Sequence, residues 1–208
     1  MSEHKYQIIR RFGPSVLKIK IPQDVVDNLN NYIDNLIKDD SKSKKLNYGE
    51  YLVGDVTQEF LLEKEIIKES GWLNFLSTCA QKWIEVETGK KISKFALKQS
   101  WIVRQFKNEY NPIHYHSGSL SGVGYLKVPK NFTKSKKKSK TNGTIDFIHG
   151  SRSFLNKSIF NHKPKEGDMI IFPNYLMHTV YPFNVDGERR SFSFNIDIDK
   201  KILEKING

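Results

Sequence analysis

A series of short strand-like segments in the second half of the chain constrains its fold more than any other feature. These segments are rich in aromatic and β-branched residues and are bounded by Gly, Pro, Asn or Asp, which is typical of strands joined by turns. They cover residues 95–106, 113–116, 123–128, 144–148, 169–172, 178–183 and 189–198. About seven strands at this spacing, with Asp186-Gly187 as a hairpin turn, predict a barrel or a double-sheet sandwich.

Helical patterns precede this β region. Apolar residues recur at helical spacing over 25–37 and again over 72–84. We expect Ser70 to be the N-cap of the second helix and Gly89 to lie near its end. Apolar residues alternate with lysines over 17–21, which predicts an early strand. The helices are therefore expected to cover one face of a sheet.

Composition supports one compact domain. Of the 208 residues, 38% are hydrophobic and 12% are aromatic, which supplies a sizeable core and argues against disorder. No repeat and no second core-sized unit is visible. We expect a single domain over 1–208, with N-terminal strands and supporting helices in 1–94 and the β core in 95–200.

Cysteine usage and hydropathy indicate the compartment. The single cysteine, Cys79, excludes a disulfide scaffold and Cys-based zinc modules. No apolar run approaches the ~18 residues of a membrane-spanning helix, and the first residues carry no signal-like apolar stretch. We expect a soluble cytoplasmic protein that does not act at a membrane.

The chain carries a formal net charge of +11, from 34 basic and 23 acidic residues. Five lysines fall in one run, 134–140, and without them the charge drops from +11 to +6. A Lys/Ser run between two predicted strands is most often a solvated hairpin loop. A loop that tracks nucleic-acid phosphates is the alternative, so nucleic acid stays open as a partner without being favoured.

Three of the six histidines stand out. His114 and His116 are two residues apart, so on an extended segment they point to the same side. His178 would join them from a distant strand. Two near ligands and one remote ligand are a usual way to build an open metal site in a β-barrel. The alternative is an incidental surface or packed pair of histidines.

The segment after His178 adds a possible carboxylate-binding group. If residues 186–187 form a two-residue turn, the register sets His178 opposite Asn195, on the face shared by Arg189, Ser191, Ser193 and Asn195. A guanidinium binds a carboxylate with two parallel hydrogen bonds, so this face suits a metal ligand that bears a carboxylate. The alternative is the wet side of an amphipathic hairpin.

Four ordered motifs, HYHSGSLSGVGYL, GTIDF, PKEGDMIIFPNYLMH and GERRSFSFN, resemble the Fe(II)- and 2-oxoglutarate-dependent dioxygenases. The likeness covers roughly 101–198 and looks closest to a small branch found in marine bacteria and phages. It implies a mainly β fold with flanking N-terminal helices and a double-stranded β-helix core, that is, a cupin-like jelly roll. It also implies that the metal lies between the two sheets.

The resemblance assigns roles by position. His114 matches the first metal ligand and His178 the distal one. Arg189 matches the arginine that grips the far carboxylate of 2-oxoglutarate, and Ser191 matches the serine that assists it. The remaining candidates for the cosubstrate pocket are Tyr125, whose hydroxyl would meet the same carboxylate, and the weaker candidates Gln105 and Asn195.

One position departs from the family pattern. Most members have H-x-D, whereas this chain has His116 in place of the aspartate. Three interpretations compete, of which we favour the first: His116 is the third ligand, Asp146 supplies the carboxylate, or the site binds metal poorly and the protein is not an enzyme. A three-histidine site would leave the ferrous ion with its full +2 charge.

The resemblance implies an oxygenase that uses Fe(II), 2-oxoglutarate and dioxygen and releases succinate and carbon dioxide. Its expected primary substrate is a protein residue, such as proline, or a small molecule. The alternatives are an enzyme that oxidises a nucleobase and a non-catalytic cupin-like barrel that holds a metal or ligand. The sequence is compatible with a homodimer.

Overall fold

The computed structural model describes residues 6–10, 13–132 and 141–204, and the lysine run 134–140 lies outside them. Two antiparallel sheets form the core of the described chain. The larger sheet has the order β1-β2-β9-β6-β11-β4-β3. Its strands are β1 (Tyr6–Arg10), β2 (Ser15–Lys20), β9 (Asp168–Pro173), β6 (Leu120–Lys127), β11 (Arg189–Ile198), β4 (Phe95–Gln105) and β3 (Gln58–Leu61).

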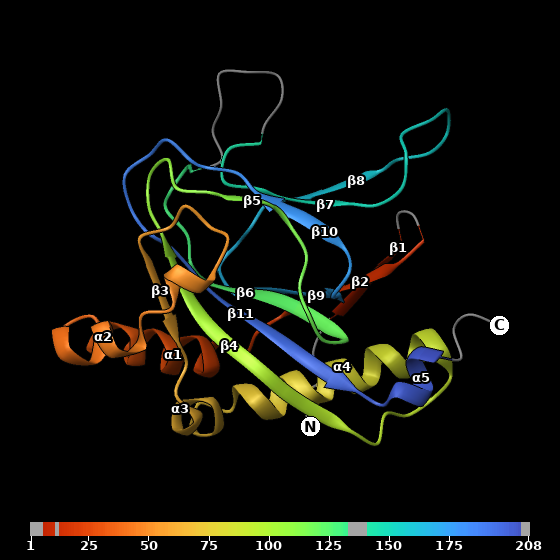
Figure 1. The fold of residues 1–208 in the computed structure, drawn as a ribbon, viewed down its shortest axis with the longest axis horizontal. Coiled ribbons are helices and arrows are strands. Elements are labelled where there is room, and N and C mark those ends of the chain that lie inside the picture. Colours follow the sequence, from red (N-terminus) through yellow and green to blue (C-terminus); the bar gives the residue numbers. More distant parts are fainter. Residues whose placement is uncertain (1–5, 11–12, 133–140, 205–208) are drawn as a thin grey trace.

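The smaller sheet has the order β5-β10-β7-β8. Its strands are β5 (Asn111–His114), β10 (Met177–Val180), β7 (Ile145–Ile148) and β8 (Ile159–His162). The helices are α1 (Gln23–Leu36), α2 (Asp40–Leu46), the 3-10 helix η1 (Gly49–Tyr51), α3 (Lys64–Glu69), α4 (Trp72–Thr88) and α5 (Lys200–Glu204). Figure 1 shows the main helices along one face of the larger sheet and the smaller sheet against its other face. The predicted mainly β jelly-roll sandwich with N-terminal helices is confirmed.

The helical layer forms because each long helix has one apolar face. In α1 the buried residues are Val25, Val26, Leu29, Ile33 and Leu36, and their spacing places them on one side. The start of α4 differs from the prediction. Ser70 is the C-cap of α3, and the N-cap of α4 is Gly71, whose φ of 79° is accessible to glycine without strain. No described helix is long and apolar enough to cross a membrane.

Strand β11 divides its side chains between two environments. Phe192 and Phe194 point to the helical layer, where both rings pack edge-on against Trp72 at 5.2 and 5.7 Å between centroids. Neighbouring β6 has glycine opposite each phenylalanine, and a Cβ on Gly122 or Gly124 would lie 2.3 Å from a phenylalanine ring. The intervening residues of β11 face the smaller sheet, as the predicted alternation requires.

The predicted hairpin between β10 and β11 is wrong. Strand β10 pairs with β5 and β7, whereas β11 pairs with β4 and β6 in the opposite sheet. The connection over 181–188 is too long for a two-residue turn and passes from one sheet to the other. His178 therefore does not lie opposite Asn195 in a ladder. It faces β11 across the interior.

Candidate active site

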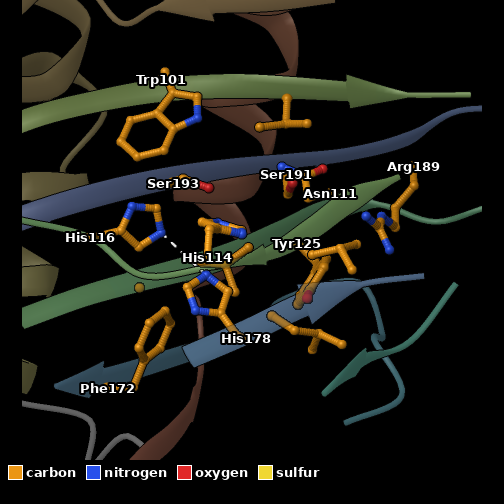
Figure 2. A pocket seen from close by; sticks show the side chains of 15 residues that line it. Trp101, Asn111, His114, His116, Tyr125, Phe172, His178, Arg189, Ser191 and Ser193 are labelled. Atoms are coloured by element: carbon orange, nitrogen blue, oxygen red, sulfur yellow. Dashed lines mark hydrogen bonds between the residues drawn. The ribbon is translucent and has the colours of Figure 1, made fainter. Parts of the chain in front are cut away.

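Three histidines meet in the interior between the sheets. His114 ends β5 and is the register partner of His178 on β10, and His116 follows two residues after the strand ends. The ligand atoms of all three lie within 4.8 Å of one another. The Nε2 atoms of His116 and His178 are 3.2 Å apart. The predicted convergence of near and distant histidines is therefore present in the structure (Figure 2).

Backbone carbonyls orient two of these rings. The Nδ1 of His114 lies 2.7 Å from the carbonyl oxygen of Pro112, and the Nδ1 of His178 lies 3.0 Å from that of Leu176. When Nδ1–H donates to a carbonyl, the Nε2 lone pair stays free for a metal. The local backbone thus directs two Nε2 atoms to a common point.

The surroundings keep the imidazoles neutral. Burial lowers the pKa of His116 to about 4, with a further contribution from His114. Burial also lowers the pKa of His114, and it lowers that of His178 well below its ordinary value. Neutral imidazole is the form that binds a metal ion. Three converging neutral imidazoles with oriented lone pairs fit a divalent metal such as iron.

Asp146 lies outside this cluster. Its carboxylate accepts hydrogen bonds from Asn161 Nδ2 at 2.6 Å and from the Tyr181 hydroxyl at 3.0 Å. The next residue on β7, Phe147, is the register partner of His178 and contacts its ring. Because successive strand residues point to opposite faces, Asp146 is directed away from the histidines.

Arg189 lies at the other end of the same pocket. Its side chain is 3% exposed and donates one hydrogen bond to the Gly143 carbonyl oxygen at 2.9 Å and another to Gln105 Oε1. Its Nε has no hydrogen-bond partner, and no carboxylate of the described chain forms an ion pair with it. Burial lowers the pKa of Arg189 to about 10. A buried, uncompensated guanidinium calls for an anion from outside the chain.

The next residue shows what a compensated arginine looks like in this fold. Arg190 points to the opposite face, where its Nε lies 2.7 Å from Glu188 Oε1 and its Nη2 2.7 Å from Asp34 Oδ1. Asn30 on α1 accepts a further bond at 3.0 Å. Arg190 therefore ties β11 to α1, and the two consecutive arginines have different roles.

The pocket joins the histidines to Arg189, with Tyr125 and Ser191 between them in Figure 2. Burial raises the pKa of Tyr125 to about 12, so its hydroxyl stays protonated. The structure places Gln105 behind Arg189, where it also donates to the Glu109 carbonyl, and not on the pocket wall. Asn195 lines an adjoining cavity instead, and its Oδ1 accepts a bond from Ser121 at 2.8 Å.

Sequence reasoning missed two groups near the site. Asn111 lines the pocket at the start of β5, and Glu59 on β3 lines the adjoining cavity. Nothing in the local pattern marks either residue, because neither strand was predicted at those positions. Both become visible only through the strand pairing.

Residues 99–195, which carry this pocket, match the family model described as "Putative 2OG-Fe(II) oxygenase". Residues 99–195 are therefore identified as a 2OG-Fe(II) oxygenase segment. The cofactor of this enzyme family is Fe(II), and 2-oxoglutarate is its cosubstrate. No curated protein matches the chain.

Solved structures share the fold of this oxygenase at low sequence identity. A Pseudomonas putida prolyl-4-hydroxylase matches with 14% identity and a TM-score of 0.55, covering 92% of each chain. HygX from Streptomyces hygroscopicus, bound to nickel, 2-oxoglutarate and hygromycin B, matches with 13% identity and a TM-score of 0.55, covering 88% of this chain and 82% of that one. A Trichoplax adhaerens prolyl hydroxylase bound to a peptide fragment matches with 11% identity and a TM-score of 0.55, covering 96% and 86%.

Proposed function

We propose that this oxygenase hydroxylates a residue of a protein, such as proline, or a small molecule, and converts 2-oxoglutarate to succinate and carbon dioxide. His114, His116 and His178 would hold the iron, and Arg189 would bind the far carboxylate of 2-oxoglutarate. When bound, the iron supplies oxygen activation, and the chain supplies orientation, charge neutralisation and a dry pocket.

The uncompensated charge of Arg189 is the observation that carries the proposal. An arginine this deeply buried normally has an acidic partner, as Arg190 does. Arg189 instead presents an unpaired Nε in a pocket that ends at three histidines. A ligand with an anionic group at one end and metal-binding oxygens at the other satisfies both ends, and 2-oxoglutarate has that form.

The remaining pocket residues support the same cosubstrate. Ser191 and Tyr125 are register partners on β11 and β6, and both line the pocket. Each can place a hydroxyl beside a carboxylate. The cavity between the histidines and Arg189 has a volume of about 50 Å³.

The chemistry of the third ligand position bears on activity. His116 takes the place of the usual carboxylate, and no acidic residue joins the described cluster. The ion would then keep its full +2 charge, of which the metal-binding carboxylate of 2-oxoglutarate can offset one unit, because the far carboxylate neutralises Arg189. A non-catalytic metal-binding barrel is the outcome if this compensation does not support turnover.

Succinate formation tests the proposal. The intact protein should convert 2-oxoglutarate to succinate when ferrous iron and dioxygen are present, and His178→Ala should lose this activity together with tight iron binding. His149→Ala is the matched control, because His149 lies outside the cluster. Iron binding without succinate formation would support the non-catalytic barrel. Failure to bind both iron and 2-oxoglutarate would overturn the site itself.

A further inference from the structure

A second cavity opens beside the histidines, and Arg189 does not line it. It has a volume of about 200 Å³ and shares Trp101, Asn111, His114 and His116 with the first pocket. Its outer wall comes from residues 48–53, the segment around η1. A molecule in this cavity would therefore contact the metal-binding histidines from the side opposite to Arg189.

Glu59 is an unusual residue in the wall of this cavity. It is the register partner of Val103 on β4, so its side chain points into the interior between the sheets. The residue is 1% exposed, and neither carboxylate oxygen has a hydrogen-bond partner in the described chain. A buried carboxylate without a donor is strongly unfavourable and calls for an explanation.

Among the residues that the structure describes, no cation compensates Glu59. Arg104, which follows Val103 on β4, is held by Glu188 at 2.7 Å and by Gln58. The charge that acts on the Glu59 carboxyl group is that of Glu109, which has the same sign. Burial and this like charge raise the pKa of Glu59 to about 8. A cation beside the carboxylate would reverse that shift.

The rim of the cavity is aromatic. The rings of Tyr48 and Tyr51 lie 4.9 Å apart between centroids, and Tyr115 lines the cavity from the loop that follows β5. Tyr51 and Tyr115 are 73% and 70% exposed. Aromatic faces attract organic cations, and exposed aromatic side chains around a cavity are typical of binding sites.

We propose that this second cavity binds the primary substrate through a cationic nitrogen, an ammonium or guanidinium group, with Glu59 as its counter-ion. This inference rests on the proposed function, because it places the carbon to be oxidised beside the three histidines. The tyrosine rim would contact the part of the substrate nearest to solvent. A basic side chain of a peptide and a small organic amine present the same group.

A competing role for Glu59 is to offset the charge of the metal, since the third ligand is a histidine in place of a carboxylate. The two roles make different predictions. A counter-ion for the substrate affects the binding of organic cations and leaves metal affinity unchanged. If Glu59 offsets the charge of the metal, replacing it should weaken the binding of the metal to the protein, whichever organic ligand is present.

Calorimetric titrations of the protein already loaded with nickel and 2-oxoglutarate test the proposal without turnover. The probes are butylammonium, butylguanidinium and neutral 1-pentanol, followed by short peptides with one central lysine or arginine. We expect the cations to bind and 1-pentanol not to bind. Glu59→Gln should weaken cation binding at least tenfold. Glu50→Gln, which removes an exposed charge from the segment around η1, should not weaken it.

The outcomes separate the hypotheses. Equal cation affinity in the parent and Glu59→Gln proteins would overturn the assignment, and so would weaker nickel binding in Glu59→Gln. Binding of the small cations alone indicates a small amine as substrate, and tighter binding of a basic peptide indicates a protein substrate. If the protein binds these cations but forms no succinate, the proposed oxygenase activity is wrong and the proposed cation site is still supported.

Discussion

Replacing Arg189 with methionine should separate ligand binding from stability. Methionine keeps much of the side-chain length and removes the charge. The far carboxylate of 2-oxoglutarate would lose two charge-assisted hydrogen bonds, each contributing about 1.5–3 kcal/mol. A loss of about 4 kcal/mol corresponds to an increase in Kd of about a thousandfold.

The expected change in stability is small because two effects oppose each other. Burial lowers the pKa of Arg189 from 12.5 to about 10, so removing the charge recovers about 3 kcal/mol. The substitution also leaves the Gly143 carbonyl and Gln105 Oε1 without a donor, at a cost of about 1–2 kcal/mol each. The free energy of unfolding of Arg189→Met should therefore stay within about 1 kcal/mol of the parent value.

Arg190→Met is the matched control. It removes the ion pairs of Arg190 with Glu188 and Asp34. Because Glu188 keeps Arg104 as a partner and Asp34 is half-exposed, the expected loss is that of a hydrogen bond to a charged group, about 1.5–3 kcal/mol. Urea denaturation measures the stability of both variants, and calorimetry with nickel measures their 2-oxoglutarate affinity. If Arg189→Met is as unstable as Arg190→Met and binds 2-oxoglutarate normally, Arg189 is a structural residue and the reasoning fails.

His178→Ala should weaken iron binding by more than about 100-fold, as measured by isothermal titration calorimetry. Loss of a group that hydrogen-bonds to a metal ligand already costs about 10–100-fold, and loss of the ligand itself should cost more. Gln105→Ala should raise the Kd of 2-oxoglutarate about tenfold, because Arg189 loses its positioning acceptor. Trp72→Ala should lower the free energy of unfolding by about 3–5 kcal/mol, as measured in urea. Burial raises the pKa of Glu59 from 4.5 to about 8 in the folded protein. The free energy of unfolding should therefore fall as the pH rises from 4.5 to 8, by at most about 5 kcal/mol. The same decline in a Glu59→Gln protein would contradict this.

Local patterns in the sequence predicted much of the site. The alternation along β11 placed Arg189 and Ser191 on one face, and the structure has both in the pocket. The spacing of His114 and His116 predicted a shared direction, which the cluster contains. Both features depend on the period of an extended strand, and that period is readable within a few residues.

Features that depend on distant pairing were not predictable. The hairpin assumption for β10 and β11 failed because a turn signal does not specify which sheet each strand joins. The alternation could not show that Arg190 has acidic partners and Arg189 has none, since one of them, Asp34, is 156 residues away. Glu59 is one of 23 acidic residues, and its burial results only from the pairing of β3 with β4.

We propose that one ligand, 2-oxoglutarate, connects the histidine cluster to Arg189. The most direct test compares 2-oxoglutarate with 2-oxopentanoate, which has a methyl group in place of the far carboxylate, as ligands of the nickel-loaded protein. The parent should prefer 2-oxoglutarate by about 100-fold or more, and Arg189→Met should show almost no preference. The same preference in both proteins would mean that Arg189 does not hold the carboxylate.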